Sequence, residues 1–221
     1  FLGTGNPEAA RVYHRLGWRK LAGTNVMALI VGGETPERSL AELFQPGGTV
    51  VVDAMTPAAR IPMIPLLVSP HDEVMLDANA GMVSTKFAVQ HSCMGLFPRY
   101  DRLTRCGWGA VFCARTHEDR LVGLATAKVD DSGLCAVDGF VHRSCVEAWE
   151  GLIRAALDWG SGAGATGFSA DVAVADEDKR RGFERLGFAT AGRRQPFVVE
   201  GRSIDAIHMM RFNLGRDGGD E

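Results

Sequence analysis

One short pattern of residues occurs twice in this chain, and the distance between its copies limits the folds that are possible. The segment Asn6–Trp18 aligns without a gap with Asp176–Phe188, at a constant offset of 170 residues. Each copy opens with an Asx residue suited to cap a helix and closes on Leu-Gly-aromatic, where the glycine fits the left-handed turn that ends a helix. A period of this length is far too long for a solenoid, so the sequence predicts two copies of one domain.

The position of the first copy predicts how the domains are divided. It begins only five residues into the chain, which has no initiator Met. We therefore expect residues 1–31 to be the C-terminal piece of a first domain, and the sequence to be a fragment of a longer protein. Residues 32–48 have the composition of a linker with a short helix at Glu37–Phe44. Residues 49–212 form a complete second domain, and residues 213–221 a polar, mobile tail.

Hydrophobic periodicity predicts the elements of the second domain. Their order is a strand, helices, a three-strand meander, a helix, a strand, the repeated helix and two strands, which indicates an α/β (α+β) fold with a mixed sheet covered by helices. Pro62 and Pro65 should break or kink the helix that starts near Thr56. The predicted strands are Thr24–Val31, Thr49–Asp53, Trp108–Arg115, Leu121–Val129, Leu134–Val141, Gly167–Val174, Phe188–Val199 (interrupted around Gly192–Pro196) and Ser203–Phe212, and the predicted helices include Asn79–Phe97 and Glu147–Trp159.

Composition excludes several classes of protein. The net charge of −3 leaves no basic surface for nucleic acid. No stretch approaches the ~20 apolar residues that cross a membrane, and the start does not resemble a signal peptide. Five cysteines without a C-x-x-C pair argue against a zinc site or a disulfide framework. The histidines show no metal-ligand spacing, so we expect a cytoplasmic protein without a metal.

The repeated motif resembles that of the GNAT acyltransferase superfamily, N-x-x-A-x-x-x-Y-x-x-L-G-F/W. Asn6, Ala9, Tyr13 and the ending Leu16-Gly17-Trp18 match it. The resemblance implies the GNAT fold, a mostly antiparallel sheet whose splayed central strands admit acetyl-CoA as acyl donor. It also implies that Asn6 reaches the pantetheine arm and that Tyr13 protonates the leaving thiolate. The alternative is an amphipathic helix in which Tyr13 only packs.

The second copy departs from the family pattern at the same positions. Asp176 replaces the asparagine, and Phe183 replaces the tyrosine and has no proton to give. The family's pyrophosphate loop, R/Q-x-x-G-x-G/A, is also degraded, because Val146 stands at its basic position and Trp149 at its first glycine, with the acid Glu147 between them. The residues that the resemblance still offers for cofactor binding in this domain are Phe140, Val141, Arg143, Gly151 and Leu152.

Asp138 lies on the last strand of the meander, where the family often places a carboxylate that deprotonates the acceptor amine. A structural acid is the other interpretation. The leading hypothesis is a tandem-GNAT N-acetyltransferase that uses acetyl-CoA to acetylate a small-molecule amine, with its chemistry mainly in the first domain of the same protein. The alternative hypothesis is a non-catalytic GNAT-like module for binding or assembly.

Overall fold

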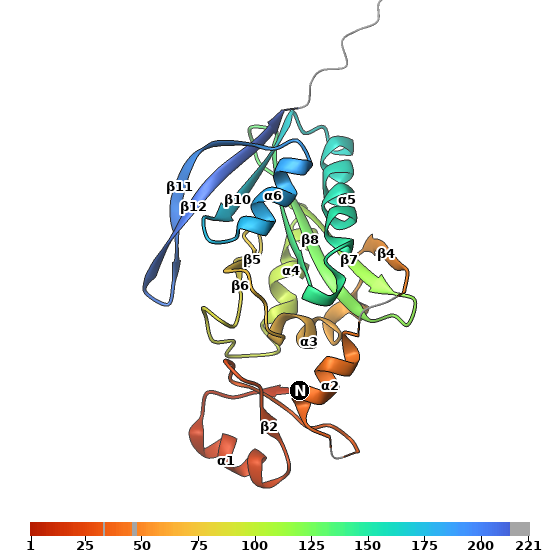
Figure 1. Cartoon of the computed structure of the whole chain (residues 1–221), viewed down its shortest axis with the longest axis vertical. Helices are drawn as coiled ribbons and strands as arrows, with labels where there is room; N and C mark the ends of the chain where they lie inside the picture. Colours follow the sequence, from red (N-terminus) through yellow and green to blue (C-terminus); the bar gives the residue numbers. More distant parts are fainter. Residues whose placement is uncertain (33, 46–47, 213–221) are drawn as a thin grey trace, which may run out of the picture.

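Seven strands form the central sheet, in the order β11-β12-β10-β9-β8-β7-β4 (Figure 1). The computed structural model describes residues 1–32, 34–45 and 48–212, so the predicted tail lies outside the described residues. Within this sheet only the described pair β9–β10 is parallel, which confirms the predicted mixed, mostly antiparallel sheet. The strands are β4 Val50–Ala54, β7 Gly109–Thr116, β8 Leu121–Val129, β9 Leu134–Val141, β10 Gly167–Ala173, β11 Ala189–Val199 and β12 Arg202–Phe212.

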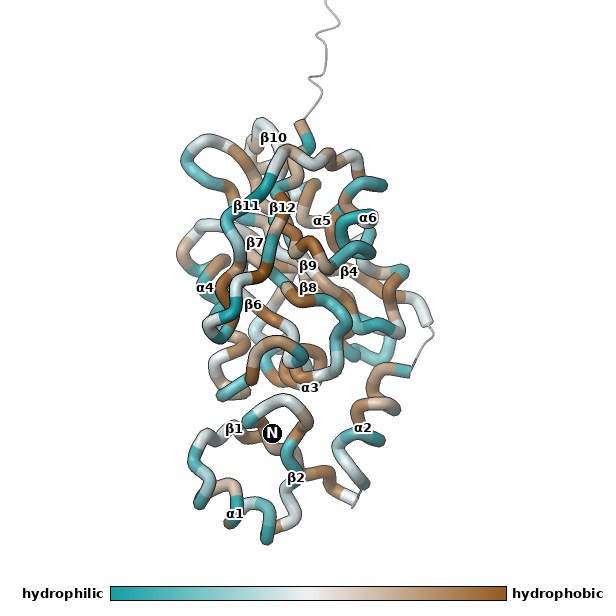
Figure 2. The backbone as a smooth tube through the Cα atoms, turned by 60° about the vertical axis from the view of Figure 1, so that its left-hand side comes forward, coloured by the Kyte–Doolittle hydropathy of each residue, from teal (hydrophilic) through white to brown (hydrophobic). Residues whose placement is uncertain are grey.

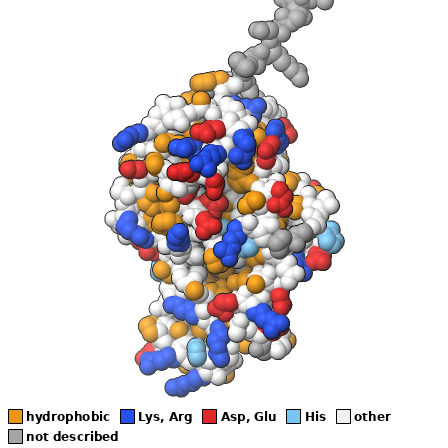
Figure 3. All heavy atoms as spheres, viewed as in Figure 1, with side chains coloured by type: hydrophobic (Ala, Val, Ile, Leu, Met, Phe, Trp, Pro, Cys, Tyr) orange, Lys and Arg blue, Asp and Glu red, His pale blue; other side chains and the backbone are white. Residues whose placement is uncertain are grey.

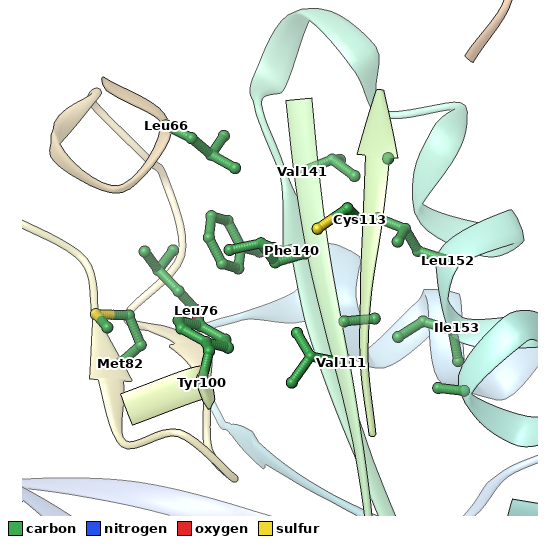
Figure 4. Close-up of a cluster of buried hydrophobic side chains, with 14 of the residues drawn as sticks. Leu66, Leu76, Met82, Tyr100, Val111, Cys113, Phe140, Val141, Leu152 and Ile153 are labelled. Atoms are coloured by element: carbon green, nitrogen blue, oxygen red, sulfur yellow. The ribbon is translucent and has the colours of Figure 1, made fainter. Parts of the chain in front are cut away.

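Helices cover both faces of the sheet. Helix α5 (Ala148–Gly162) packs on β7, β8 and β9, while α3 (Met63–Val68) and α4 (Leu96–Arg105) contact β8 and β7. Figure 4 shows Leu152 and Ile153 of α5 on one side of the central strands and Leu66 and Tyr100 on the other. The chain is correspondingly apolar along α3 and the central strands in Figure 2. None of the described helices is long and apolar enough to cross a membrane.

The predicted helix at Asn79–Phe97 is wrong. The chain there forms the short strand β6 (Met82–Val83), which pairs with β5 (Met75–Asp77), followed by a loop that reaches α4. Gly81 has a φ of +61°, and the Ser84 hydroxyl accepts a hydrogen bond from the backbone of Lys86. Local side-chain bonds of this kind compete with helical hydrogen bonds, and apolar spacing alone does not reveal them.

Two shorter segments follow the sequence closely. A 3₁₀ turn, η1 (Pro57–Arg60), precedes α3, so the helix is interrupted near Pro62 as predicted. Pro65 lies in the first turn of α3, where a missing N–H breaks no helical bond. The linker contains α2 (Pro36–Leu43), which begins at a Thr35 cap and agrees with the predicted short helix.

Residues 1–28 form a separate sheet in the order β1-β3-β2, from β1 (Leu2–Gly3), β2 (Arg19–Lys20) and β3 (Val26–Ala28). Helix α1 (Pro7–Arg15) connects β1 to β2, as α6 (Glu177–Arg185) connects β10 to β11. The strand order β10-β12-β11 repeats the same topology in the large sheet. We call residues 1–31 the N-terminal unit.

The two copies of the motif also share their hydrogen bonds. The backbone N–H of Trp18 donates to the carbonyl of Tyr13, and that of Phe188 donates to the carbonyl of Phe183, both at 3.1 Å. The glycine between them is left-handed in each copy, with φ of +93° and +85°. Both helices therefore end in the same glycine-centred turn, and the aligned sequence has one local structure.

The N-terminal unit packs against the loop that replaces the predicted helix (Figure 1). The N–H of Asn25 donates to the carbonyl of Gln90 at 2.7 Å, and its side chain contacts His91 at 3.1 Å. A Cβ on Gly3 would lie 2.9 Å from Cα of Ser92, so only glycine fits this approach. On the face shown in Figure 3, acidic and basic side chains are interspersed, in keeping with the small net charge.

Candidate functional site

The parallel strands β9 and β10 separate after a short stretch of pairing. Their residues pair only from Gly167 with Leu134 to Ser169 with Ala136, although β9 runs on to Val141 and β10 to Ala173. This divergence is the splay that the resemblance predicts. The space between the two diverging strands, here called the gap, is the place where the family receives its acyl donor.

A buried ion pair crosses the gap. Lys179 of α6 places its Nζ 2.6 Å from Oδ1 of Asp138 on β9, and the two side chains are only 3% and 1% exposed. The carboxylate of Asp138 also accepts hydrogen bonds from the N–H groups of Ala78 and Gly139. Burial raises the pKa of Asp138, whereas Lys179 and these two donors act to lower it. Lys179 and these donors occupy both carboxylate oxygens of the buried Asp138, which favours the interpretation as a structural acid over that as a base.

A second carboxyl group lies beside this pair. Asp77 is fully buried, accepts a hydrogen bond from the Thr126 hydroxyl, and accepts another from the N–H of Ala80. Burial first, and then the negative charge of Asp138, raise the pKa of Asp77 to about 7. This carboxyl group therefore keeps its proton to a higher pH than an ordinary aspartate, which relieves the repulsion between the two acids.

Asp176 has a different partner from the one its position suggests. It precedes α6 but makes no capping bond to that helix. Its two carboxylate oxygens instead accept from the N–H groups of Val74 and Met75, at 2.8 and 3.1 Å. Lys179 donates to the carbonyl groups of Met75 and Leu76. The replacement of asparagine by aspartate thus supplies two acceptors that hold the segment Val74–Leu76 against the start of α6.

Trp149 closes the gap from the side of α5. Its indole N–H donates to the carbonyl of Gly139 on β9 at 2.9 Å, and its ring meets that of Phe183 edge to face at 5.1 Å. A Cβ at Gly182 would lie 2.7 Å from this ring. The indole therefore occupies the backbone edge of β9 that the splay exposes, and it fixes α5 to α6.

The hollow that remains outside the gap is acidic. It has a volume of about 220 Å³ and is lined by four acids and two bases. Lys179 is one of the bases and is already paired with Asp138. A diphosphate would meet repulsion here rather than a cradle of free N–H groups. The charged lining residues are Glu73, Glu147, Glu150, Asp178, Lys179 and Arg185.

The cofactor residues expected in this domain lie in different environments, and two of them, Val141 and Arg143, line one hollow together. The side chains of Phe140, Val141 and Leu152 are buried in the hydrophobic core. Gly151 is the fourth residue of α5, and a Cβ there would meet only Val52, at 3.9 Å. Arg143 lies in a 3₁₀ turn, η2 (Arg143–Cys145), at the rim of an adjoining hollow.

The other two predicted site residues belong to the N-terminal unit. The side chain of Asn6 caps α1 by accepting from the N–H groups of Glu8 and Ala9. Tyr13 is partly exposed and meets Trp18 edge to face at 6.1 Å. None of the residues of α1 is buried, whereas Lys179, Gly182 and Phe183 of α6 are. Tyr13 lies on α1 and Asp138 on β9 of the large sheet, and no hydrogen bond or ion pair joins these two described residues.

Sequence reasoning missed Lys179, Asp77 and Thr126. Lys179 stands where the first copy has Ala9, so a charged residue at a small-residue position was the available signal. Asp77 follows three consecutive apolar residues, which is a common setting for a buried acid. Neither signal identifies its partner, because Asp77, Asp138 and Lys179 are brought together only by the fold. Among the described residues, no group of three or more His, Cys, Asp or Glu is placed to hold a metal ion.

Comparison of whole structures agrees with this architecture. A spermidine N-acetyltransferase from Vibrio cholerae, solved as a dodecamer, superposes with a TM-score of 0.58 at 16% identity, covering 76% of this chain and 98% of its own. An acetyltransferase candidate from Acinetobacter baylyi gives a TM-score of 0.59 at 12% identity, covering 75% and 93%. No family model matches the sequence, and no curated protein is similar to it. The chain therefore has the GNAT fold, shared with structures that differ widely from it in sequence.

Proposed function

We propose that this chain belongs to a tandem-GNAT N-acetyltransferase that transfers an acetyl group from acetyl-CoA to the amine of a small molecule. The N-terminal unit is the end of the first, catalytic domain, and residues 49–212 are a second domain that has lost the chemistry. The observation that carries the proposal is the doubled β-α-β-β unit, with Tyr13 in one copy and Phe183 at the same place in the other.

The environment of α1 supports a catalytic role for the first copy. Tyr13 is partly exposed and has an hydroxyl group that can give a proton to a leaving thiolate. Val12 of the same helix and Leu16 at its C-terminal cap are 54% and 65% exposed. Exposed apolar residues on a helix of this kind are suited to contact further parts of a first domain.

The second domain has the opposite properties. Phe183 is fully buried, Trp149 occupies the edge of β9, and Lys179 joins Asp138 across the gap. These contacts occupy positions at which the resemblance implies the acyl donor and its proton donor, and the acidic hollow would repel its phosphates. They favour a structural role for residues 49–212, which supports the alternative of a non-catalytic module for this domain taken alone.

The two tyrosines of the chain provide a matched test of the catalytic role. Tyr13→Phe in the complete protein should lower the rate of amine acetylation by roughly 10²-fold or more, as expected for loss of a general acid. Tyr100→Phe is the control, since Tyr100 is buried in the core and its hydroxyl has no hydrogen-bond partner among the described residues. Equal rates for Tyr13→Phe and the parent protein would remove Tyr13 from this role.

Calorimetric titration with acetyl-CoA tests the proposal that only the first domain binds the acyl donor. The complete protein should bind acetyl-CoA with a micromolar Kd, while the 221-residue chain should show no binding in this range. Micromolar binding by the 221-residue chain would contradict the loss of the cofactor site in its complete domain. Absence of binding by the complete protein would contradict acetyl transfer altogether and leave the non-catalytic module.

A further inference from the structure

A second hollow lies on the α4 side of the sheet, where β7 begins and β8 ends. Its volume is about 550 Å³, and its lining comes from α4, from the residue before β7, from the end of β8 and from the turn after β5. It shares no lining residue with the acidic hollow beside the gap. Three cations, Arg99, Arg102 and Lys128, line it together with Trp108 and Asn79, and no carboxylate does.

Two of these cations contact the indole ring of Trp108. The guanidinium of Arg102 lies 5.2 Å from the centre of the indole ring, and the ammonium of Lys128 lies 5.9 Å from it. The electron-rich ring attracts each cation, while the cations repel one another. An anion between them would turn this repulsion into attraction.

None of the three cations forms an ion pair within the described part of the chain, although Lys128 also acts on the exposed carboxylate of Asp130. Arg105, on the same helix, pairs with Asp101 at 2.6 Å, but no ion pair involves Arg99, Arg102 or Lys128. Arg99 uses Nη1 to donate to the carbonyl of Gly81 at 2.7 Å. That bond fixes the guanidinium at the rim of the hollow, and an arginine has further N–H donors for a ligand.

We propose that this hollow binds a small oxyanion that carries two or more negative charges, held by Arg99, Arg102 and Lys128. Guanidinium groups match the oxygens of phosphoryl and carboxylate groups by paired hydrogen bonds, and Lys128 adds a mobile point charge. The site is independent of the proposed acetyl transfer, because neither the gap nor the N-terminal unit contributes to its lining.

Calorimetric titration of the 221-residue chain with sodium pyrophosphate at low ionic strength tests the proposal. Binding should be detectable at submillimolar concentration and should weaken as salt is added. Arg102→Gln and Lys128→Met should each weaken it by about fivefold or more, since each removes a charged hydrogen-bond donor. Arg105→Gln is the matched control, because it removes the same charge from the same helix outside the hollow.

Equal weakening by Arg105→Gln and Arg102→Gln would overturn the site, because binding would then follow net charge alone. Absence of binding by the parent chain up to 10 mM pyrophosphate would also overturn it. A parallel titration with citrate identifies the source of the oxyanion. Tighter binding of pyrophosphate indicates a phosphoryl ligand and tighter binding of citrate a carboxylate ligand, and either result supports the site. The substituted side chains are exposed, and unchanged thermal unfolding of the variants verifies that they remain folded.

Discussion

The ion pair across the gap is open to a direct test by replacement of Lys179 with methionine. Methionine keeps an unbranched side chain but removes the charge that lies 2.6 Å from Asp138. It also removes the donor to the carbonyl groups of Met75 and Leu76. Breaking one side of a buried ion pair costs about 3–5 kcal/mol, which is a large part of the 5–15 kcal/mol that typically stabilises a domain.

This loss of stability should depend on pH, because Asp138 can take up a proton in the variant and so remove its unpaired buried charge. Protonating a carboxyl group of ordinary pKa costs about 1.4 kcal/mol per pH unit above that pKa, hence about 4 kcal/mol at pH 7 and under about 2 kcal/mol at pH 5. In the parent chain burial alone would lower the pKa of Lys179, but Asp138 outweighs it and the pKa is raised. The stabilising contribution of the Lys179 charge is therefore fully present below the ordinary pKa of a lysine, a range that includes pH 5 and pH 7.

Urea unfolding followed by tryptophan fluorescence measures this effect at both pH values. Lys179→Met should lose more stability at pH 7 than at pH 5. The double variant Lys179→Met/Asp138→Asn should recover about 1–2 kcal/mol at pH 7, since the unpaired charge is gone. Lys20→Met, at an exposed site on β2, is the control and should be neutral. A loss below about 1 kcal/mol at pH 7, or one that grows toward pH 5, would refute the reasoning.

Two further predictions concern the neighbouring contacts. Gly182→Ala places a Cβ 2.7 Å from the ring of Trp149 and should cost about 1–3 kcal/mol in urea unfolding, whereas Gly162→Ala, which has open space at the end of α5, should cost nothing. Asp77→Asn tests the raised pKa of about 7: the folded state keeps a proton that the unfolded state releases, so the unfolding free energy of the parent falls as pH rises from about 4 to 7. The variant should lack this fall, up to roughly 4 kcal/mol, and unfolding curves across that range that coincide with those of the parent would contradict it.

The order of helices and strands could be predicted, because the conformation of most of these elements is determined by residues within the element itself. The turn Glu200-Gly201 has a positive φ at both positions, which the polar pair indicates. The interruption of β11 coincides with register shifts between Thr190 and Gly192 and between Arg194 and Phe197, close to the predicted one. The loop at Asn79–Phe97 could not be predicted, because its conformation depends on the N-terminal unit and on bonds to distant residues.

The sequence predicts which segments border the candidate site, but it does not predict which side chains contact one another there. The repeat identified α6, and the family's pyrophosphate-loop pattern identified the loop before α5, as the departures from the family pattern, and both contribute to the hollow beside the gap. The sequence could not reveal that Asp176 holds a segment 101 residues earlier in the chain. Buried polar pairs of this kind form between residues that only the tertiary fold brings close together. The spacing of residues along one helix does not predict which distant residues those are.

The three departures in the second copy act as one unit. Asp176, Lys179 and Phe183 lie three and then four residues apart, so they share one face of α6. Each has a partner within its own domain, in the segment Val74–Leu76, in Asp138 and in Trp149. On the corresponding face of α1, the side chain of Asn6 bonds to its own helix, and the aromatic partner of Tyr13 is Trp18 of the same repeated segment. Reversing Phe183 to tyrosine would therefore leave the gap filled, because the ion pair and the indole would remain.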